Sequence, residues 1–171
     1  MKHLLIVDGY NLIHCGTRYK RLAEKDLDQA RIRLIEDLAA LAMLADYDVI
    51  VVFDAAATGN KERSRASVLG IEVWFTRGGE SGDSLVERLA YEKSGGRSVT
   101  VVTSDYAQQK VVSKPGISVK SSRQLCEEVA QILEETTRSY IESAKPGKRP
   151  RLEDRIDGAV KKALDRLIRD F

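Results

Sequence analysis

The stretch that decides the fold is "LLIVDGYNLIH", residues 4–14. It begins with the apolar run Leu4–Val7 and stops on Asp8. Gly9 then allows a turn, and Asn11 follows three residues after the acid. An uninterrupted apolar run of this kind is typical of a strand buried on both faces, as in a parallel sheet. An acid at the end of such a strand has two explanations: it caps a following helix, or it forms one corner of a metal site.

The same pattern repeats along the chain. Four further apolar runs are predicted as strands, at Val49–Phe53, Ile71–Phe75, Ser98–Val102 and Ile117–Val119. Helical periodicity lies between the strands, at residues 26–45, 81–93, 104–112 and 121–137. Strands that alternate with helices predict βαβ units, and hence an α/β fold with a central, mostly parallel five-stranded sheet.

The chain divides by composition into three segments. Residues 1–144 carry all the predicted strands, and a basic linker at residues 145–151 follows, within "AKPGKRPR". Residues 152–171 are expected to form a last amphipathic helix, with an apolar stripe at Leu152, Ile156, Val160, Ala163, Leu167 and Phe171. This stripe needs a surface to pack on, either the outer layer of its own domain or a partner.

The bulk composition excludes several classes of protein. The chain has 171 residues, 43% of them hydrophobic and 32% charged, and a net charge of +2, which suits one soluble domain and indicates no particular partner. Residues 145–171 hold 9 basic and 5 acidic side chains, so the excess charge lies in the tail. No run approaches the roughly 18 apolar residues of a membrane span, and no secretory signal pattern opens the chain. With Cys15 and Cys126 far apart, we expect two reduced thiols in a cytoplasmic protein.

Acidic side chains collect where the predicted strands end. Asp8, Asp54 and Asp105 each follow a strand, and Glu80 and Asp83 lie in "GESGD" at the start of a helix. The carboxyl ends of parallel strands point to one edge of the sheet, so these five acids are expected to converge there. Carboxylates gathered closely repel one another unless some are protonated or a cation lies among them. Oxygen ligands suit Mg²⁺ or Mn²⁺, which can activate water and stabilise the leaving oxygen of a phosphodiester.

Helix capping explains each acid separately, but it does not explain the set. An Asp after a strand is a common N-cap, and negative charge there is favoured by the helix dipole. Asp54 could also belong to a simple turn, and Glu80 could be an exposed acid in a first helical turn. Capping does not require carboxylates on separate strands to face a shared crevice, so their convergence favours a metal site. Asn11 could position a water molecule or a phosphate at the same edge.

Other catalytic motifs are missing from the sequence. It contains no G-x-G-x-x-G after a strand, no G-x-x-x-x-G-K-[ST] loop and no G-x-S-x-G elbow. A metal-dependent phosphatase of the haloacid dehalogenase type would need a second Asp two residues after Asp8, where Tyr10 stands. His3 is expected to start a strand, and His14 to have a structural or substrate-contacting role.

Basic side chains near the predicted edge suit a polyanionic substrate. Seven cations are interpreted as RNA-binding: Arg18, Lys20, Arg21, Lys61, Arg63, Arg65 and Arg77. Such groups hold phosphates whatever the base sequence, although each one alone is as well explained as ordinary solvated surface. Tyr10, Tyr19 and Tyr106 could stack on bases or simply pack inside the protein.

Four motifs, in this order, resemble a known family. "IVDGYNLIH", "VVFDA", "GIEVWFTRGGESGDSLVERL" and "VVTSDYAQQ" are similar to the YacP-like family of NYN domains, which are relatives of PIN-domain nucleases. The similarity covers roughly residues 3–137 and leaves out the tail after Ala144. It implies a three-layer α/β/α PIN-like fold and a Mg²⁺- or Mn²⁺-dependent endoribonuclease, with mRNA cleaved in association with ribosomes.

The resemblance also implies roles for individual residues. Asp8, Asn11, Asp83 and Asp105 match motif positions that would be catalytic. The five acids that would hold the metal are Asp8, Asp54, Glu80, Asp83 and Asp105. Gly82 stands where Ala is expected, which leaves the acids in place but could loosen the start of the helix. The alternative to an enzyme is a non-catalytic RNA- or ribosome-binding module on the same fold.

Overall fold

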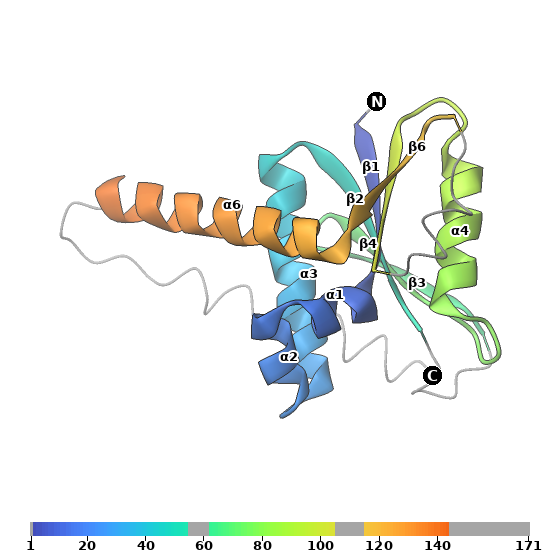
Figure 1. The fold of residues 1–171 in the computed structure, drawn as a ribbon, viewed down its shortest axis with the longest axis horizontal. Helices are drawn as coiled ribbons and strands as arrows, with labels where there is room; N and C mark the ends of the chain where they lie inside the picture. The colour runs from blue at the N-terminus through green and yellow to red at the C-terminus, as the bar shows by residue number, and fades with distance from the viewer. Residues whose placement is uncertain (1, 55–61, 105–114, 144–171) are drawn as a thin grey trace.

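A six-stranded sheet forms the centre of the computed structural model, which describes residues 2–54, 62–104 and 115–143 (Figure 1). The strands are β1 (His3–Asp8), β2 (Tyr47–Phe53), β3 (Ser64–Val68), β4 (Ile71–Phe75), β5 (Val99–Thr103) and β6 (Ile117–Ser121). Their order is β3-β4-β2-β1-β5-β6, and every pairing is parallel except that of β3 with β4. The five parallel strands therefore end at one edge of the sheet. This edge carries Asp8 and Asp54 and is called the acid edge.

Helices cover both faces of this sheet. On one face lie α1 (Gly9–Cys15), α2 (Thr17–Ala23), α3 (Leu27–Leu44) and α6 (Ser122–Ser143), and on the other lies α4 (Gly82–Lys93) (Figure 1). Each face has its own apolar core, because successive side chains of a strand point to opposite faces. In β1, Leu5 and Val7 join the core under α3, whereas Leu4 and Ile6 join the core under α4. The result is a three-layer helix–sheet–helix arrangement.

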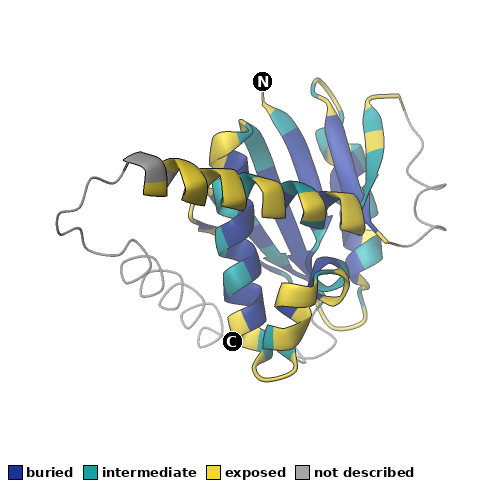
Figure 2. Ribbon diagram, turned by 60° about the vertical axis from the view of Figure 1, so that its left-hand side comes forward, coloured by how far each residue is buried: buried dark blue, intermediate teal, exposed yellow. Residues whose placement is uncertain are grey.

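Burial follows these layers. The central strands β1, β2 and β5 are almost entirely buried (Figure 2). In α6, Leu125 and Val129 are buried in the core, but exposure increases along the helix until Ile141 keeps 66% of its surface open. The outer half of α6 projects beyond α3 in Figure 1 and is mostly exposed in Figure 2.

The predicted three-layer, mostly parallel fold is confirmed, with one strand more than the five expected. The additional strand is β3, whose sequence "SRASV" alternates between buried and more open positions at the sheet edge and is too polar to stand out as an apolar run. The helices expected at 26–45 and 81–93 are present as α3 and α4, and α6 continues past residue 137 to Ser143.

Other expectations differ from the structure or fall outside it. The sequence pattern does not predict the short helices α1 and α2. The helix expected at 104–112 lies, from residue 105 on, outside the described residues, as do the linker 145–151 and the tail 152–171. No helix in the described part of the chain has the length and apolar character needed to cross a membrane.

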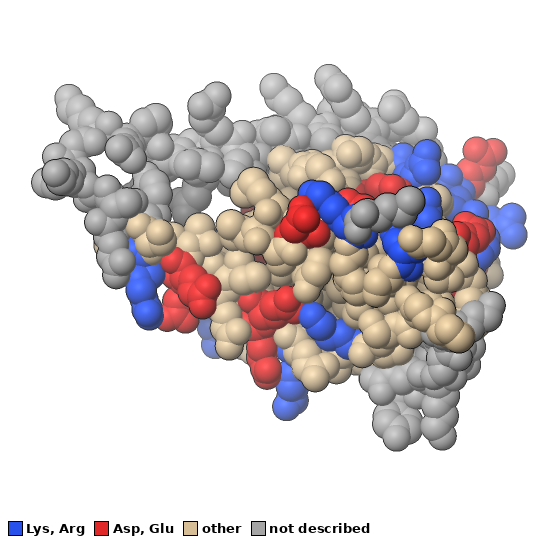
Figure 3. Space-filling view, turned by 90° about the horizontal axis from the view of Figure 1, so that it is seen from above, with Lys and Arg blue, Asp and Glu red and all other residues tan. Residues whose placement is uncertain are grey.

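The edge of the sheet opposite the acid edge is neutralised by ion pairs. Lys2 Nζ lies 2.8 Å from Asp46 Oδ1, and Arg97 Nη1 lies 2.7 Å from Asp48 Oδ2. In a view onto the end where the N-terminus lies, acidic and basic side chains sit next to one another (Figure 3). The two edges of the sheet therefore differ in their electrostatic character.

Candidate active site

Asp8 is both the last residue of β1 and the N-cap of α1. Its Oδ1 accepts the backbone N–H of Asn11 at 3.0 Å, and its Oδ2 accepts the Asn11 side-chain amide, also at 3.0 Å. Gly9 makes this close turn possible, because a Cβ at this position would lie 2.4 Å from Cε1 of Phe53. The sequence "DGYN" is therefore a local unit in which an amide holds the carboxylate in one orientation.

Asp83 approaches the Asp8 carboxyl from the first turn of α4. The pKa of Asp8 rises from 3.8 to about 6, chiefly because the group is buried. The negative charge of Asp83 and hydrogen bonding with its carboxyl add to this rise, while the backbone N–H of Asn11 opposes it. Two acids from different elements are thus brought together at the acid edge, as strand topology predicts.

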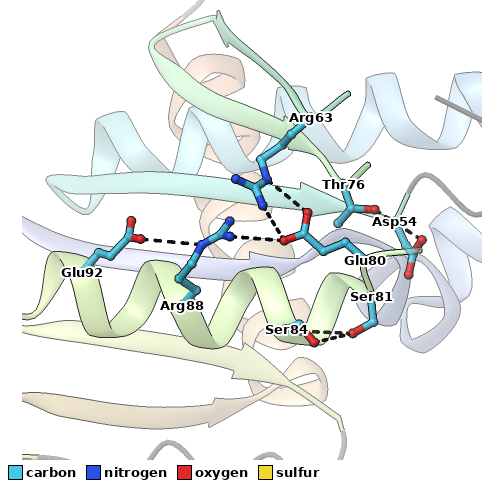
Figure 4. A network of polar contacts seen from close by, with 8 residues as sticks. All are labelled: Asp54, Arg63, Thr76, Glu80, Ser81, Ser84, Arg88 and Glu92. Carbon is cyan, nitrogen blue, oxygen red and sulfur yellow. Dashed lines mark hydrogen bonds and ion pairs between the residues drawn. The ribbon is translucent and has the colours of Figure 1, made fainter. Parts of the chain in front are cut away.

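Asp54 connects the end of β2 to the start of α4. Its Oδ2 accepts the backbone N–H of Gly82 at 3.0 Å, and its Oδ1 accepts the hydroxyl of Thr76 at 3.4 Å. Thr76 follows β4 directly and is fully buried. Figure 4 shows Asp54 and Thr76 together near the N-terminal end of α4. Asp54 therefore helps to fix the helix start that carries Asp83.

Glu80 points away from Asp54 and toward two arginines (Figure 4). Its Oε1 lies 2.5 Å from Arg63 Nη2 and 3.4 Å from Arg88 Nη1, and its Oε2 accepts Arg63 Nε at 3.1 Å. Burial alone would raise the pKa of Glu80, but the arginines hold it below the ordinary value. A metal-binding role for Glu80 stays a prediction. Its ion pairs indicate a structural role, because they connect Arg63, which directly precedes β3, with Arg88 of α4.

The described acids do not complete a metal site by themselves. Within residues 2–54, 62–104 and 115–143, no three or more Asp, Glu, His or Cys side chains converge closely enough to hold an ion. Asp105, the last acid of the predicted set, lies outside the described residues. β5 pairs with β1 and ends at Thr103, so the chain leaves the sheet beside Asp8. The Asp8–Asp83 pair offers oxygen ligands, which fit Mg²⁺ or Mn²⁺.

A buried cation that the sequence reasoning missed lies behind these strand ends. Arg31 of α3 is 5% exposed, and its guanidinium carbon lies 5.3 Å from the ring centroid of Tyr10 and 5.9 Å from that of Phe53. Arg31 also donates a hydrogen bond to the Tyr10 hydroxyl. Tyr10 and Phe53 pack edge to face with ring centroids 5.4 Å apart. Together with Arg31 they connect α1 to β2. A signal was available, because Arg31 stands four residues after Leu27 on the apolar stripe of its helix.

The first three predicted RNA-binding cations lie on α2. Arg18, Lys20 and Arg21 are exposed, although Arg18 Nη1 also lies 3.5 Å from Oδ2 of the buried Asp37. Tyr19 is 4% exposed and donates its hydroxyl to Asp37 at 2.8 Å, so it packs inside the protein and does not present its ring for base stacking. Arg18 and Arg21 line a cavity of about 640 Å³ between α2 and α3.

The other predicted RNA-binding cations flank β3 and β4. Arg63 is paired with Glu80, and the guanidinium carbon of Arg65 lies 5.3 Å from the ring centroid of Trp74. Arg77 is exposed and precedes the loop that leads to α4, which places it next to the acid edge. Lys61 and Tyr106 lie outside the described residues. The described cations are thus spread over two regions rather than gathered in one patch.

Comparisons with known proteins find one family along almost the whole chain. The family model for the YacP-like NYN domain matches residues 5–169. The match runs through the tail, so the expectation that the resemblance leaves out the residues after Ala144 is wrong. The protein YacP of Bacillus subtilis (strain 168) is 33% identical over 156 residues, which cover 90% of this chain and 91% of YacP.

Crystal structures of Rae1 (YacP) from Bacillus subtilis are similar in fold. A structure of a mutant has a TM-score of 0.68 at 33% identity, with 90% of this chain and 89% of that chain covered. A second structure has a TM-score of 0.69 at 29% identity, with 96% and 90% covered. The sequence match and the fold agree, and the chain belongs to the YacP-like NYN domain family.

Proposed function

We propose that this protein is a metal-dependent endoribonuclease, which hydrolyses phosphodiester bonds within RNA with Mg²⁺ or Mn²⁺ as its cofactor. The observation that carries the proposal is the pairing of Asp8 and Asp83, from β1 and α4, at the acid edge. Two carboxylates held together against their mutual repulsion are typical of a site that accepts a cation. Membership of the NYN family supports a ribonuclease-type function.

Each residue of the site has a task in this proposal. Asp8 and Asp83 would hold the ion together with Asp105, and Asp54 would keep the start of α4 in place. The ion, when bound, would lower the pKa of a water molecule and stabilise the charge that develops on the leaving oxygen. Asn11 keeps the Asp8 carboxylate in one orientation through its two hydrogen bonds. The carboxyl of Asp8 must lose its proton before it can bind the ion, so metal affinity should fall below about pH 6.

The substrate in this proposal is RNA, and we expect it to be mRNA cleaved in the cytoplasm in association with ribosomes. The exposed Arg77 next to the acid edge supports contact with a phosphate there, and the cations of α2 offer further contacts. Phosphate contacts of this kind position a nucleic acid without selecting a base sequence. A long polyanion can reach both regions, whereas a small phosphate ester cannot.

The decisive experiment compares two aspartates that both cap helices. Asp26 caps α3 by accepting the backbone N–H groups of Asp28 and Gln29, as Asp8 caps α1. Asn caps a helix about as well as Asp, so Asp8→Asn and Asp26→Asn should both stay folded. With Mg²⁺ or Mn²⁺, wild type and Asp26→Asn should cut RNA internally, and EDTA should stop the reaction. Asp8→Asn and Asp83→Asn should cut at least about 100-fold more slowly.

A non-catalytic RNA- or ribosome-binding module is the second candidate. Two observations favour it: both Glu80 oxygens are occupied by arginines, and the described ranges hold no group of three metal-binding side chains. RNA binding that persists in EDTA and in Asp8→Asn, without cleavage of any RNA in either metal, would establish this module. Equal cleavage by Asp8→Asn and Asp26→Asn would instead show that Asp8 is only a cap and that the proposed site is wrong.

A further inference from the structure

The outer half of α6 borders a groove that shares one side chain, Arg18, with the residues of the nuclease proposal. This groove, of about 680 Å³, lies between α6 and the α2–α3 pair. Its apolar lining consists of Ala130, Leu133 and Ile141. Leu133 packs partly against the core, whereas Ile141 is 66% exposed in the same helix. An apolar strip that leaves the core and continues into an open groove is suited to receive another apolar surface.

The chain that follows α6 has such a surface. Residues 152–171 carry nine apolar side chains, and six of them, from Leu152 to Phe171, recur at three- and four-residue spacing. As a helix these residues would form a single stripe about 30 Å long. A helix of this length gains most of its stability from covering its apolar stripe. Because the family model matches as far as residue 169, this tail accompanies the domain in its family and is not an addition peculiar to this chain.

We propose that residues 152–171 fold back as a helix along the outer half of α6 and fill the groove. α6 ends at Ser143, only two residues after Ile141. The eight residues 144–151 can span up to about 27 Å, which is ample to reverse the chain direction. Two prolines and a glycine in this segment favour a turn over a continued helix.

Length and charge agree with this arrangement. The part of α6 that lines the groove, residues 130–141, is about 17 Å long, so the tail can cover it completely. Glu153 and Asp157 follow one another at helical spacing along one margin of the first half of the tail stripe. The charged lining of the groove has three arginines, Arg18, Arg33 and Arg138, and one acid, Glu134, which lies 3.4 Å from Arg138. The acidic margin of the tail can therefore face the arginines while its apolar stripe covers Leu133 and Ile141.

The test measures hydrogen exchange in the full-length chain. The variant Val160→Asp/Leu167→Asp places charge within the stripe. The control, Lys161→Asp/Arg169→Asp, acts on the opposite side of the helix and changes the net charge by more. We expect amides of residues 130–141 to exchange roughly tenfold faster, or more, in the stripe variant and at the wild-type rate in the control.

A second pair of variants tests the groove from the side of α6. Ile141→Asp should lower the Tm and speed exchange within residues 152–171, whereas Ser139→Asp, at an exposed position outside the groove lining, should do neither. If Ile141→Asp and the stripe variant leave exchange unchanged, the tail does not cover α6 and the proposal is overturned. If protection rises with protein concentration and light scattering finds a dimer, a second copy fills the groove, which also overturns the fold-back.

Discussion

The carboxyl group of Asp8 is well hydrogen-bonded, but its surroundings disfavour its negative charge. Asn11 donates to both oxygens, but burial and the neighbouring Asp83 raise the pKa to about 6 in the folded chain, from an ordinary value of 3.8. The folded state therefore binds this proton more tightly than the unfolded state does. The stability that this group contributes is fully present below about pH 4 and is lost as the pH rises through about 6.

Asp8→Asn should therefore make the folded chain more stable while it slows RNA cleavage. We expect its free energy of unfolding in EDTA to exceed that of wild type by about 1 kcal/mol or more at pH 7.5, and the difference to shrink toward pH 4.5. Urea denaturation of both proteins at the two pH values measures this difference, from which the titration of groups that do not interact with Asp8 cancels. A difference that does not grow with pH would show that burial of Asp8 does not disfavour its charge.

Gly82 is the position at which this chain departs from the expected family motif. A Cβ there would lie 3.6 Å from the Cβ of Asp54, an ordinary van der Waals contact, and the backbone N–H would still donate to Asp54. We expect Gly82→Ala to raise the free energy of unfolding by about 0.4–1 kcal/mol, because the unfolded chain loses conformational freedom, and to leave cleavage unchanged. Urea denaturation and a cleavage assay test this, and a loss of either stability or cleavage would contradict it.

β1 and α1 meet at a turn that has no room for a side chain. Because a Cβ on Gly9 would lie 2.4 Å from the Phe53 ring, Gly9→Ala must shift either α1 or that ring. We expect a cost of about 1–3 kcal/mol in the free energy of unfolding, with slower cleavage because Asp8 and Asn11 move together. Gly95→Ala is the matched control, since nothing lies within 4 Å of a Cβ there.

A compensating change sharpens the experiment on Gly9. Phe53→Leu removes the ring that the new methyl group meets, so Gly9→Ala should cost less in that background than in wild type. Thermal unfolding of the four proteins gives the coupling between the two positions. Additive effects would mean that the clash with Phe53 is not what excludes a side chain at Gly9.

Local signals in the sequence were sufficient for some elements and not for others. α3 and α4 could be predicted because Asp26 and Ser81 stand before periodic apolar stripes and do cap these helices. β3 could not, because it is an edge strand that pairs with β4 alone and needs few apolar residues. The pair Asp8–Asp83 could be expected because the carboxyl ends of parallel strands lie at one edge of the sheet, next to the starts of the helices that follow. The hydrogen bond that Arg63 donates to Glu80 could not be expected, because the two residues are 17 positions apart and no sequence spacing predicts such a pair.

Charge is distributed unequally between the two ends of the sheet. Ion pairs such as Lys2–Asp46 neutralise the end at which the strands begin, whereas Asp8 and Asp83 meet at the end where the strands finish. Acids alone would repel a phosphate backbone. Under the proposed function, RNA at the acid edge needs a cation beside it in addition to the metal. Arg77 is exposed and directly precedes the loop into α4.

Arg77→Ala should accordingly weaken RNA binding in a way that depends on salt. In an Asp8→Asn background, which should keep the RNA uncut, we expect the slope of log affinity against log salt to fall by about 0.7 when one contact to single-stranded RNA is lost. Lys2→Ala in the same background removes an equal charge at the opposite edge and should leave the slope unchanged. Because both variants change the net charge equally, a difference between them reports where the RNA lies. Equal slopes would mean that the RNA does not pass Arg77, and the path of the substrate would then have to avoid the entry to α4.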